Sequence, residues 1–269
     1  MSPPPSRVLE RVADGATERA VAAEHLLKIG AVPRLEWHLQ EPALRAIHRL
    51  QRAVWPARYT DADPYRLLWV DPAAITHHVN REETPRIFGR VAGGDWDRHR
   101  EPFAATDVHR SLEKRFEEGA DWEDTVLYGA LLSGSESGLW RRRCRTATER
   151  DRRLTAIDAL YERIAREGYR SQATLATRDG IDGIGEGNNE RSHPMLNEVG
   201  INVGRDGALL WRHRGLHRLS IAKLLGVDRI PVYVLARHAG WQRVRDRLRA
   251  GEPVGTGSDS HPDLADLRE

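Results

Sequence analysis

The chain has 269 residues, of which 30% are charged, and a formal net charge of +2, so it is long enough to bury the core of one large domain or two small ones. It contains no run of about 18 apolar residues, which excludes a membrane-spanning helix. Its start, Met1–Pro5, lacks the basic and apolar regions of a secretory signal, and the single cysteine, Cys144, has no partner for an internal disulfide. These features favour a cytoplasmic protein that does not bind membranes.

Arginine supplies nearly all of the positive charge. Only three of the 42 basic residues are lysines, namely Lys28, Lys114 and Lys223. Arginine binds phosphate and carboxylate groups bidentately, so the bias is compatible with phosphate recognition. We favour a codon preference, with most arginines paired to the 40 acidic residues, because the near-neutral balance argues against a surface coated by nucleic acid.

The N-terminal part of the chain has a helical pattern. Apolar residues recur at helical spacing in Leu9–Leu27 and in Pro42–Val54, which predicts an N-terminal helical region over residues 1–60. The apolar run Leu67–Val70 predicts a buried strand. Pro72 suits the first turn of a short helix, which we expect over Ala73–His78.

Two acidic turns, each centred on a tryptophan, lie in the next part of the chain. They are Gly93–Asp97 and Gly119–Asp124, and Asp121 is expected to cap a helix that begins in the second turn. Their acidic residues are candidate metal ligands, but no histidine or cysteine at zinc spacing accompanies them. Trp96 and Trp122 are instead expected to anchor the turns on the core.

The second half of the chain begins with an amphipathic helix, Asp151–Tyr169, which Gly168 is expected to end. The polar stretch Arg178–Ser192 is typical of a loop. The pattern predicts a core over residues 61–245 with an insertion at about 82–150. Residues 246–269 have little apolar content, and we expect them to form a disordered tail.

Residues 197–238 predict a strand, turn, strand, helix and strand. The strands are expected at Val199–Val203, Ala208–Trp211 and Ile230–Leu235, with a hairpin turn at Gly204–Gly207. A short helix, His217–Leu225, separates the last two strands, and Gly226 is expected to end it.

The start of this helix is a candidate phosphate site. A helix preceded by Gly215 exposes unpaired backbone N–H groups at the positive end of the helix dipole. His217 and Arg218 add side-chain donors, and Ser220 adds a hydroxyl. The alternative is that Gly215 only makes the turn and that His217 and Arg218 are solvated.

This segment resembles the nucleotide-binding segment of ParB N-terminal domains, sulfiredoxins and ParB-related free-serine kinases. The shared features are Gly-x-His-Arg at the start of a short helix, Leu-Gly at its end, and a strand that begins Ile-Pro-Val. The resemblance covers about residues 156–238 and extends to Leu68–Ile75. It implies an α/β (α+β) fold of the ParB/sulfiredoxin-like superfamily, with a small mixed sheet, flanking helices, an N-terminal helical region and a helical insertion. It also implies that Gly215, His217 and Arg218 cradle nucleotide phosphates.

Two residues depart from this pattern. Leu216 stands where sulfiredoxins have their nucleophilic cysteine, so sulfinate reduction is not expected. Many relatives have an aspartate where this chain has Arg214. The arginine adds positive charge beside the phosphate site. The chain after His238 is too short for the further domains of partition proteins, so we do not expect a role in chromosome partition.

Catalytic candidates lie in the polar loop before the hairpin. Glu190 and His193 are candidates for a general base or a magnesium contact, because magnesium bound to phosphates needs only one or two carboxylates. The alternative is a mobile surface loop. Asp71 is a further acidic candidate, but we favour helix capping as its role.

The first functional hypothesis is an intracellular nucleotide-binding protein, acting as a phosphotransferase or nucleotidase on ATP or CTP with Mg²⁺. Gly215, His217, Arg218 and Ser220 would hold the phosphates, and Arg218→Ala is expected to abolish binding without changing the fold. The alternative is a nucleic-acid-binding or regulatory module without catalysis, which would use arginines such as those of Arg141–Arg145. A third reading is a scaffold with a vestigial anion site.

Overall fold

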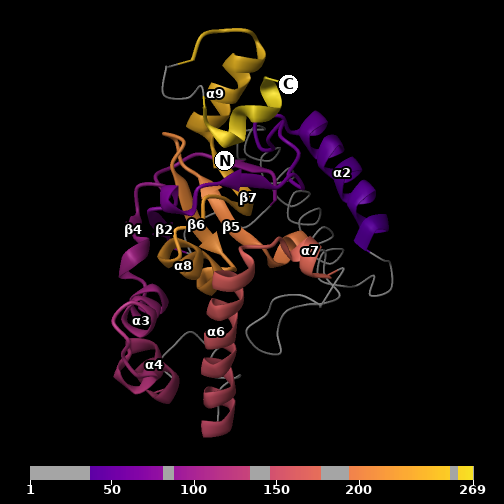
Figure 1. Cartoon of the computed structure of the whole chain (residues 1–269). Coiled ribbons are helices and arrows are strands. Elements are labelled where there is room, and N and C mark those ends of the chain that lie inside the picture. Colours follow the sequence, from indigo (N-terminus) through magenta and orange to yellow (C-terminus); the bar gives the residue numbers. More distant parts are fainter. Residues whose placement is uncertain (1–36, 81–87, 134–145, 177–193, 255–259, 269) are drawn as a thin grey trace, which may run out of the picture.

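A mixed sheet of seven strands forms the core of the protein (Figure 1). The computed structural model describes residues 37–80, 88–133, 146–176, 194–254 and 260–268. The strands are β1 (Leu68–Val70), β2 (His77–Val79), β3 (Arg90–Ala92), β4 (Arg100–Pro102), β5 (Val199–Val203), β6 (Leu209–His213) and β7 (Ile230–His238). Their order is β1-β7-β5-β6-β2-β4, and β3 pairs with the far end of β7. Helices flank this sheet, so the α/β class predicted from the sequence is confirmed.

The three central strands come from the predicted unit at residues 199–238. β5 and β6 are antiparallel and are joined by the turn Gly204–Gly207, in which Gly204 N–H and the Ala208 carbonyl are hydrogen-bonded at 2.9 Å. β7 runs parallel to β5 and is buried along its whole length. Its continuous apolar run Ile230–Ala236, interrupted by neither charge nor glycine, is typical of a strand with both faces covered.

The short strands were only partly predictable. β1 lies within the predicted apolar run and pairs with β7. The prediction of a helix over Ala73–His78 was wrong beyond the first turn, because only the 3-10 helix η1 (Pro72–Ala74) forms. The next residues enter β2, whose backbone groups pair with β6 on one side and with β4 on the other. These distant partners outweigh the local preference for a helix.

The stretch expected to be an insertion also contributes to the core. β3 and β4 both come from it, as do the helices α3 (Asp107–Phe116) and α4 (Val126–Ser133). These helices lie with α6 (Ala147–Glu167) and α8 (Leu216–Leu224) at one end of the sheet (Figure 1). The apolar side chains of the four helices form one cluster, and its fully buried members include Leu112, Leu127, Ile157 and Ile221.

The helix starts differ slightly from the prediction. α6 begins four residues before Asp151, because Thr146 and Glu149 form a capping box in which each side chain bonds the other's backbone N–H. Asp121 precedes the 3-10 helix η3 (Trp122–Asp124), but its side chain makes no cap hydrogen bond. Thr125 bonds the Tyr128 N–H at 3.2 Å in the first turn of α4 instead.

The two tryptophans anchor their acidic turns, as predicted. Trp96 is buried beside Val79 and Leu210, and Trp122 is buried among the helices. Each indole is fixed by a hydrogen bond, from Trp96 Nε1 to the Ala92 carbonyl at 3.3 Å and from Trp122 Nε1 to the Asp158 carboxylate at 3.1 Å.

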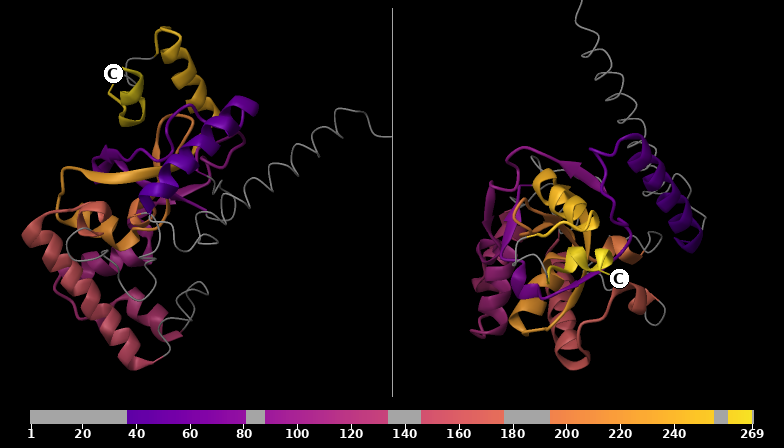
Figure 2. Two further views of the ribbon diagram at one scale, coloured as in Figure 1. Left: turned by 90° about the vertical axis from the view of Figure 1, so that its right-hand side faces the viewer. Right: turned by 90° about the horizontal axis from the view of Figure 1, so that it is seen from above.

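The opposite end of the sheet carries α9 (Ala239–Arg249) and the 3-10 helix η5 (Pro262–Leu267), while α2 (Trp37–Val54) lies along one side (Figures 1 and 2). α2 includes the predicted helix Pro42–Val54. The earlier helix predicted at Leu9–Leu27 lies outside the described residues. Within the described ranges, no helix is long and apolar enough to cross a membrane.

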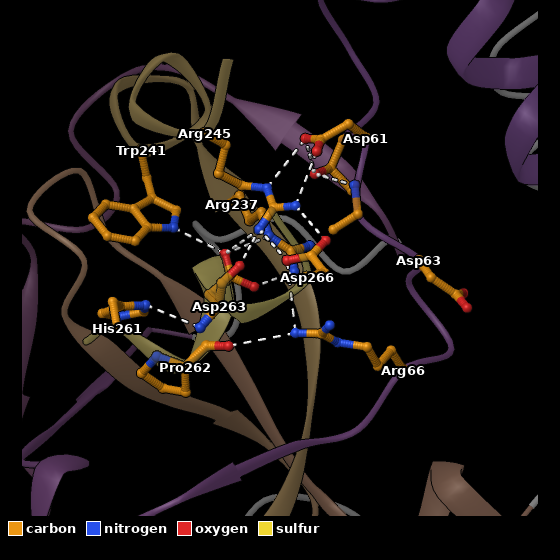
Figure 3. Close-up of polar contacts among 12 residues, drawn as sticks. Asp61, Asp63, Arg66, Arg237, Trp241, Arg245, His261, Pro262, Asp263 and Asp266 are labelled. Atoms are coloured by element: carbon orange, nitrogen blue, oxygen red, sulfur yellow. Dashed lines mark hydrogen bonds and ion pairs between the residues drawn. The ribbon is translucent and has the colours of Figure 1, made fainter. Parts of the chain in front are cut away.

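The prediction of a disordered tail over residues 246–269 was wrong for residues 246–249, which complete α9. It was also wrong for residues 260–268, where η5 is held by buried ion pairs (Figure 3). Asp263 is almost completely buried and accepts hydrogen bonds from Arg237 Nε at 2.8 Å and from Trp241 Nε1 at 2.9 Å. Arg245 is fully buried between Asp61 and the carboxylate of Asp266. The polar composition of the tail therefore reflects charges that pair with arginines of the core.

Candidate functional site

The chain turns sharply between β6 and α8. Arg214 has a φ of 49°, and Gly215 has a φ of 66° with a ψ of 17°, so two successive residues are left-handed. The turn is fixed on both sides, because Trp211 Nε1 bonds the Arg214 carbonyl at 2.8 Å and Arg214 Nη1 bonds Asn197 Oδ1 at 2.7 Å. A left-handed residue followed by a right-handed one draws successive N–H groups into a concave, anion-binding arrangement.

Gly215 is required here by its neighbour as well as by its conformation. A Cβ atom at this position would lie 2.7 Å from Val199 Cγ2 and 2.9 Å from Val199 Cα. Such separations are below van der Waals contact, so no larger residue fits without moving β5. The close contact places the start of α8 directly against the start of β5.

The first turn of α8 presents its backbone N–H groups at the N-terminal end of the helix. The first intrahelical hydrogen bond runs from Leu219 N–H to the Gly215 carbonyl at 2.8 Å. The N–H groups of Leu216, His217 and Arg218 precede it and have no carbonyl to bond within the helix. This end of the helix dipole is positive, so the position suits an anion.

The Arg218 side chain points into the protein. Only 4% of the residue is exposed, and its Nη1 forms an ion pair with Glu198 Oε2 at 3.0 Å. Its Nη2 donates to the Arg170 carbonyl, and its guanidinium carbon lies 4.3 Å from the ring centre of Tyr169. Arg218 thus joins the start of α8 to the turn that follows α6.

His217 and Ser220 are also buried. Burial, assisted by the charge of Arg153, lowers the pKa of His217 to about 3, so its imidazole is neutral near pH 7. Ser220 is fully buried, and its Oγ has no hydrogen-bond partner among the described residues. The structure therefore brings Gly215, His217 and Arg218 together in one turn, with Ser220 in the next turn of the same helix. Their direct contact with phosphate stays a prediction.

Glu198 is the residue that the sequence did not single out. It is fully buried and immediately precedes β5, and its Oε1 accepts a hydrogen bond from the Gln172 N–H in α7 (Gln172–Ala176). Burial raises the pKa of Glu198, while the charge of Arg218 and the Gln172 hydrogen bond act in the opposite direction. The only sequence signal was an acidic residue directly before an apolar strand.

Comparison with known proteins does not extend these observations. No family model, curated protein or solved structure matches the chain. The geometry of the residues at the start of α8 therefore carries the functional argument.

The other predicted sites add little to this geometry. Glu190 and His193 lie outside the described residues. The described part of the chain contains no group of three or more His, Cys, Asp or Glu residues able to hold a metal ion. Asp71 caps η1, where its Oδ1 accepts a hydrogen bond from the Ala73 N–H at 2.7 Å. The basic run Arg141–Arg145, on which the nucleic-acid alternative drew, also lies outside the described residues.

Proposed function

We propose that the protein binds nucleotides, and that the first turn of α8 holds their phosphates, as the resemblance to the ParB/sulfiredoxin-like superfamily implies. The observation that carries this proposal is the backbone at Arg214 and Gly215, where two left-handed residues lead directly into a helix start. Helix N-termini reached through such turns are established phosphate-binding arrangements because donors and dipole act together.

In this proposal the main donors are backbone groups. The N–H groups of Leu216, His217 and Arg218 face the phosphate, and Gly215 lets the backbone approach it. The partly exposed Arg214 adds positive charge at the rim. The buried guanidinium of Arg218 adds positive charge near the phosphate. The His217 imidazole is neutral, and Ser220 supplies a hydroxyl in the second turn of α8.

The finer proposal is phosphoryl transfer or phosphate hydrolysis with ATP or CTP. Such reactions depend mainly on positioning and electrostatic stabilisation, which a set of fixed backbone donors can supply. Mg²⁺ would accompany the nucleotide and neutralise phosphate charge. The protein's own part is to hold the phosphate oxygens and to fix their orientation.

Calorimetric titration with ATP, CTP and GTP, with and without Mg²⁺, tests the binding proposal. Arg214→Gln and Arg214→Glu change the rim charge in two steps, and we expect the affinity to fall about fivefold at each step, as for charges a few ångströms apart near water. The exposed Arg229 follows the other end of α8, so Arg229→Glu is the matched charge-reversal control and should leave the affinity unchanged. Absence of binding by all three nucleotides, or an equal loss in Arg229→Glu, would overturn the proposal.

The reaction is tested by analysing the nucleotide after incubation with the protein and Mg²⁺. Release of phosphate or a nucleoside diphosphate, reduced in Arg214→Glu, supports the enzymatic form. Saturable binding with the nucleotide recovered unchanged contradicts that form and leaves nucleotide binding as the function.

A further inference from the structure

A buried carboxylate already lies beside the proposed phosphate site. Glu198 has no exposed surface, and both of its oxygens are engaged, Oε1 by the Gln172 N–H at 2.5 Å and Oε2 by Arg218 Nη1 at 3.0 Å. Glu198 is adjacent to Val199, which packs against Gly215. Through its ion pair with Arg218, the carboxylate is also tied to the first turn of α8, where a phosphate would bind.

Several buried polar atoms of the residues that contact Glu198 or Arg218, and of Arg218 itself, have no partner among the described residues. They are both side-chain amide atoms of the fully buried Gln172, the hydroxyl of Tyr169 and the Nε of Arg218. Buried polar groups are nearly always hydrogen-bonded in proteins, and each one left without a partner is costly. Such a cluster, drawn from two separate parts of the chain, indicates a place where a polar ligand or a rearranged ion pair supplies the missing bonds.

We infer that Glu198 is the internal counter-anion of the phosphate site, and that a bound nucleotide phosphate takes Arg218 from it while Glu198 takes up one proton. This inference rests on the proposed function and adds a regulatory property to the same site. The step is balanced, because the carboxylate and one solvent proton give a carboxylic acid, and no other bond is made or broken.

The electrostatic reason for the exchange lies in the burial of Glu198. Arg218 is at the third position of α8, from which a side chain can reach back to the start of the helix. When the guanidinium turns to a phosphate, the carboxylate loses its cation in a site without solvent. A buried, unpaired carboxylate neutralises itself by binding a proton instead of staying charged.

The other groups that face Glu198 do not replace the lost charge. From the segment after α6, Tyr169 and Gln172 approach it, and from α8 only Arg218 does. Burial raises the pKa of Tyr169, so its phenol stays neutral. Gln172 offers only its neutral backbone and amide, and the carbonyl of Arg170 binds Arg218 itself.

Calorimetric titration of the full chain with ATP at pH 8, in two buffers of different ionisation enthalpy, measures this proton uptake. At this pH the terminal phosphate is already ionised, since its second pKa is about 6. The wild-type protein should take up roughly one proton per bound nucleotide. Glu198→Gln should take up none and should bind ATP about tenfold more tightly, because its neutral amide competes weakly for Arg218.

Glu167→Gln is the matched control. Glu167 ends α6 close to the same turn and forms an ion pair with Arg170 at 3.3 Å, but Glu167 is exposed. This variant should show the wild-type proton number and affinity. If Glu198→Gln does not fold, the wild-type proton number decides alone.

The outcomes separate the inference from the function on which it rests. Binding without proton uptake, and with equal affinity in Glu198→Gln, overturns the inference and leaves the phosphate site standing. No binding in either protein overturns the proposed function. Binding that appears only in Glu198→Gln supports the phosphate site but overturns the exchange, because Glu198 then keeps Arg218 from the phosphate in the wild-type protein.

Discussion

Gly215 packs against the backbone of Val199 so closely that a Cβ atom on the glycine would lie 2.9 Å from Val199 Cα. This contact joins the start of α8 to the start of β5. The Glu198–Arg218 ion pair links the same two elements, because Glu198 immediately precedes β5 and Arg218 lies in the first turn of α8. The left-handed conformation of Gly215 and its contact with Val199 can be tested separately. Gly226, at the other end of α8, is also left-handed but has open space around it.

We expect Gly215→Ala to destabilise the protein by about 2–5 kcal/mol. A left-handed alanine costs about 1–2 kcal/mol, and the forced contact with Val199 adds about 1–3 kcal/mol. Gly226→Ala should carry only the first of these costs. Urea unfolding of both variants gives the comparison, and equal losses would show that the contact with Val199 is not restrictive.

The Glu198–Arg218 ion pair changes what an Arg218 variant means. The sequence predicted that Arg218→Ala would leave the fold intact, but the substitution leaves Glu198 buried without its cation. Removing one partner of a buried pair typically costs about 3–5 kcal/mol. We expect a loss of this size in Arg218→Met, measured by urea unfolding at pH 8.

The double variant Arg218→Met/Glu198→Gln removes the unpaired charge along with the pair. It should recover at least about 1–2 kcal/mol of the loss, since a buried pair replaced by neutral residues is far less costly than a broken one. The exposed Arg229→Met is the control for loss of an arginine. Additive losses in the double variant would contradict a coupled pair.

The sequence predicted the fold where local pattern and burial agree. β5 and β6 are apolar runs separated by a glycine turn, and α8 separates β6 from the apolar run of β7. All three strands were predicted within three residues of their bounds. β2 was missed because His77 and His78 carry no strand pattern, and only pairing with β6 and β4 makes them extended. Glu198 was missed for the same reason, since its two partners come from distant parts of the chain.

The pH dependence of stability should report the buried state of His217. Its pKa is about 6.5 in the unfolded chain and about 3 in the folded protein, so between these values the unfolded state binds more protons. Stability therefore falls as the pH falls below 6.5, by about 2 kcal/mol at pH 5. The contribution of Glu198 has the opposite sign, because its folded pKa is raised and stability is lost as the pH rises through it.

Comparison of the wild-type protein with His217→Gln isolates this contribution, because Glu198 is present in both. The stability of the wild type relative to the variant should decrease by about 2 kcal/mol between pH 7.5 and pH 5, measured by urea unfolding. The exposed His213→Gln is the control on the same segment. Parallel pH profiles for the wild type and His217→Gln would mean that the buried ring is protonated in the folded state.

The C-terminal segment provides a last test, because its order depends on charge pairing that its composition conceals. Asp263 is bound by Arg237 and Trp241 and lies 3.7 Å from Arg245, and all three partners are buried (Figure 3). Asp263→Asn leaves two buried guanidinium groups short of an acceptor charge. We expect a loss of about 3–5 kcal/mol, together with faster hydrogen exchange in η5.

The control for this change is Asp228→Asn, in the exposed turn between α8 and β7. Exposed charges of this kind contribute little to stability, so we expect the free energy of unfolding to change by no more than about 0.5 kcal/mol. Exchange in η5 that is already fast in the wild type would mean that the segment is not held in solution. Exchange that is slow in the wild type and fast only in Asp263→Asn would show that the arginines of β7 and α9 hold the end of the chain on the sheet.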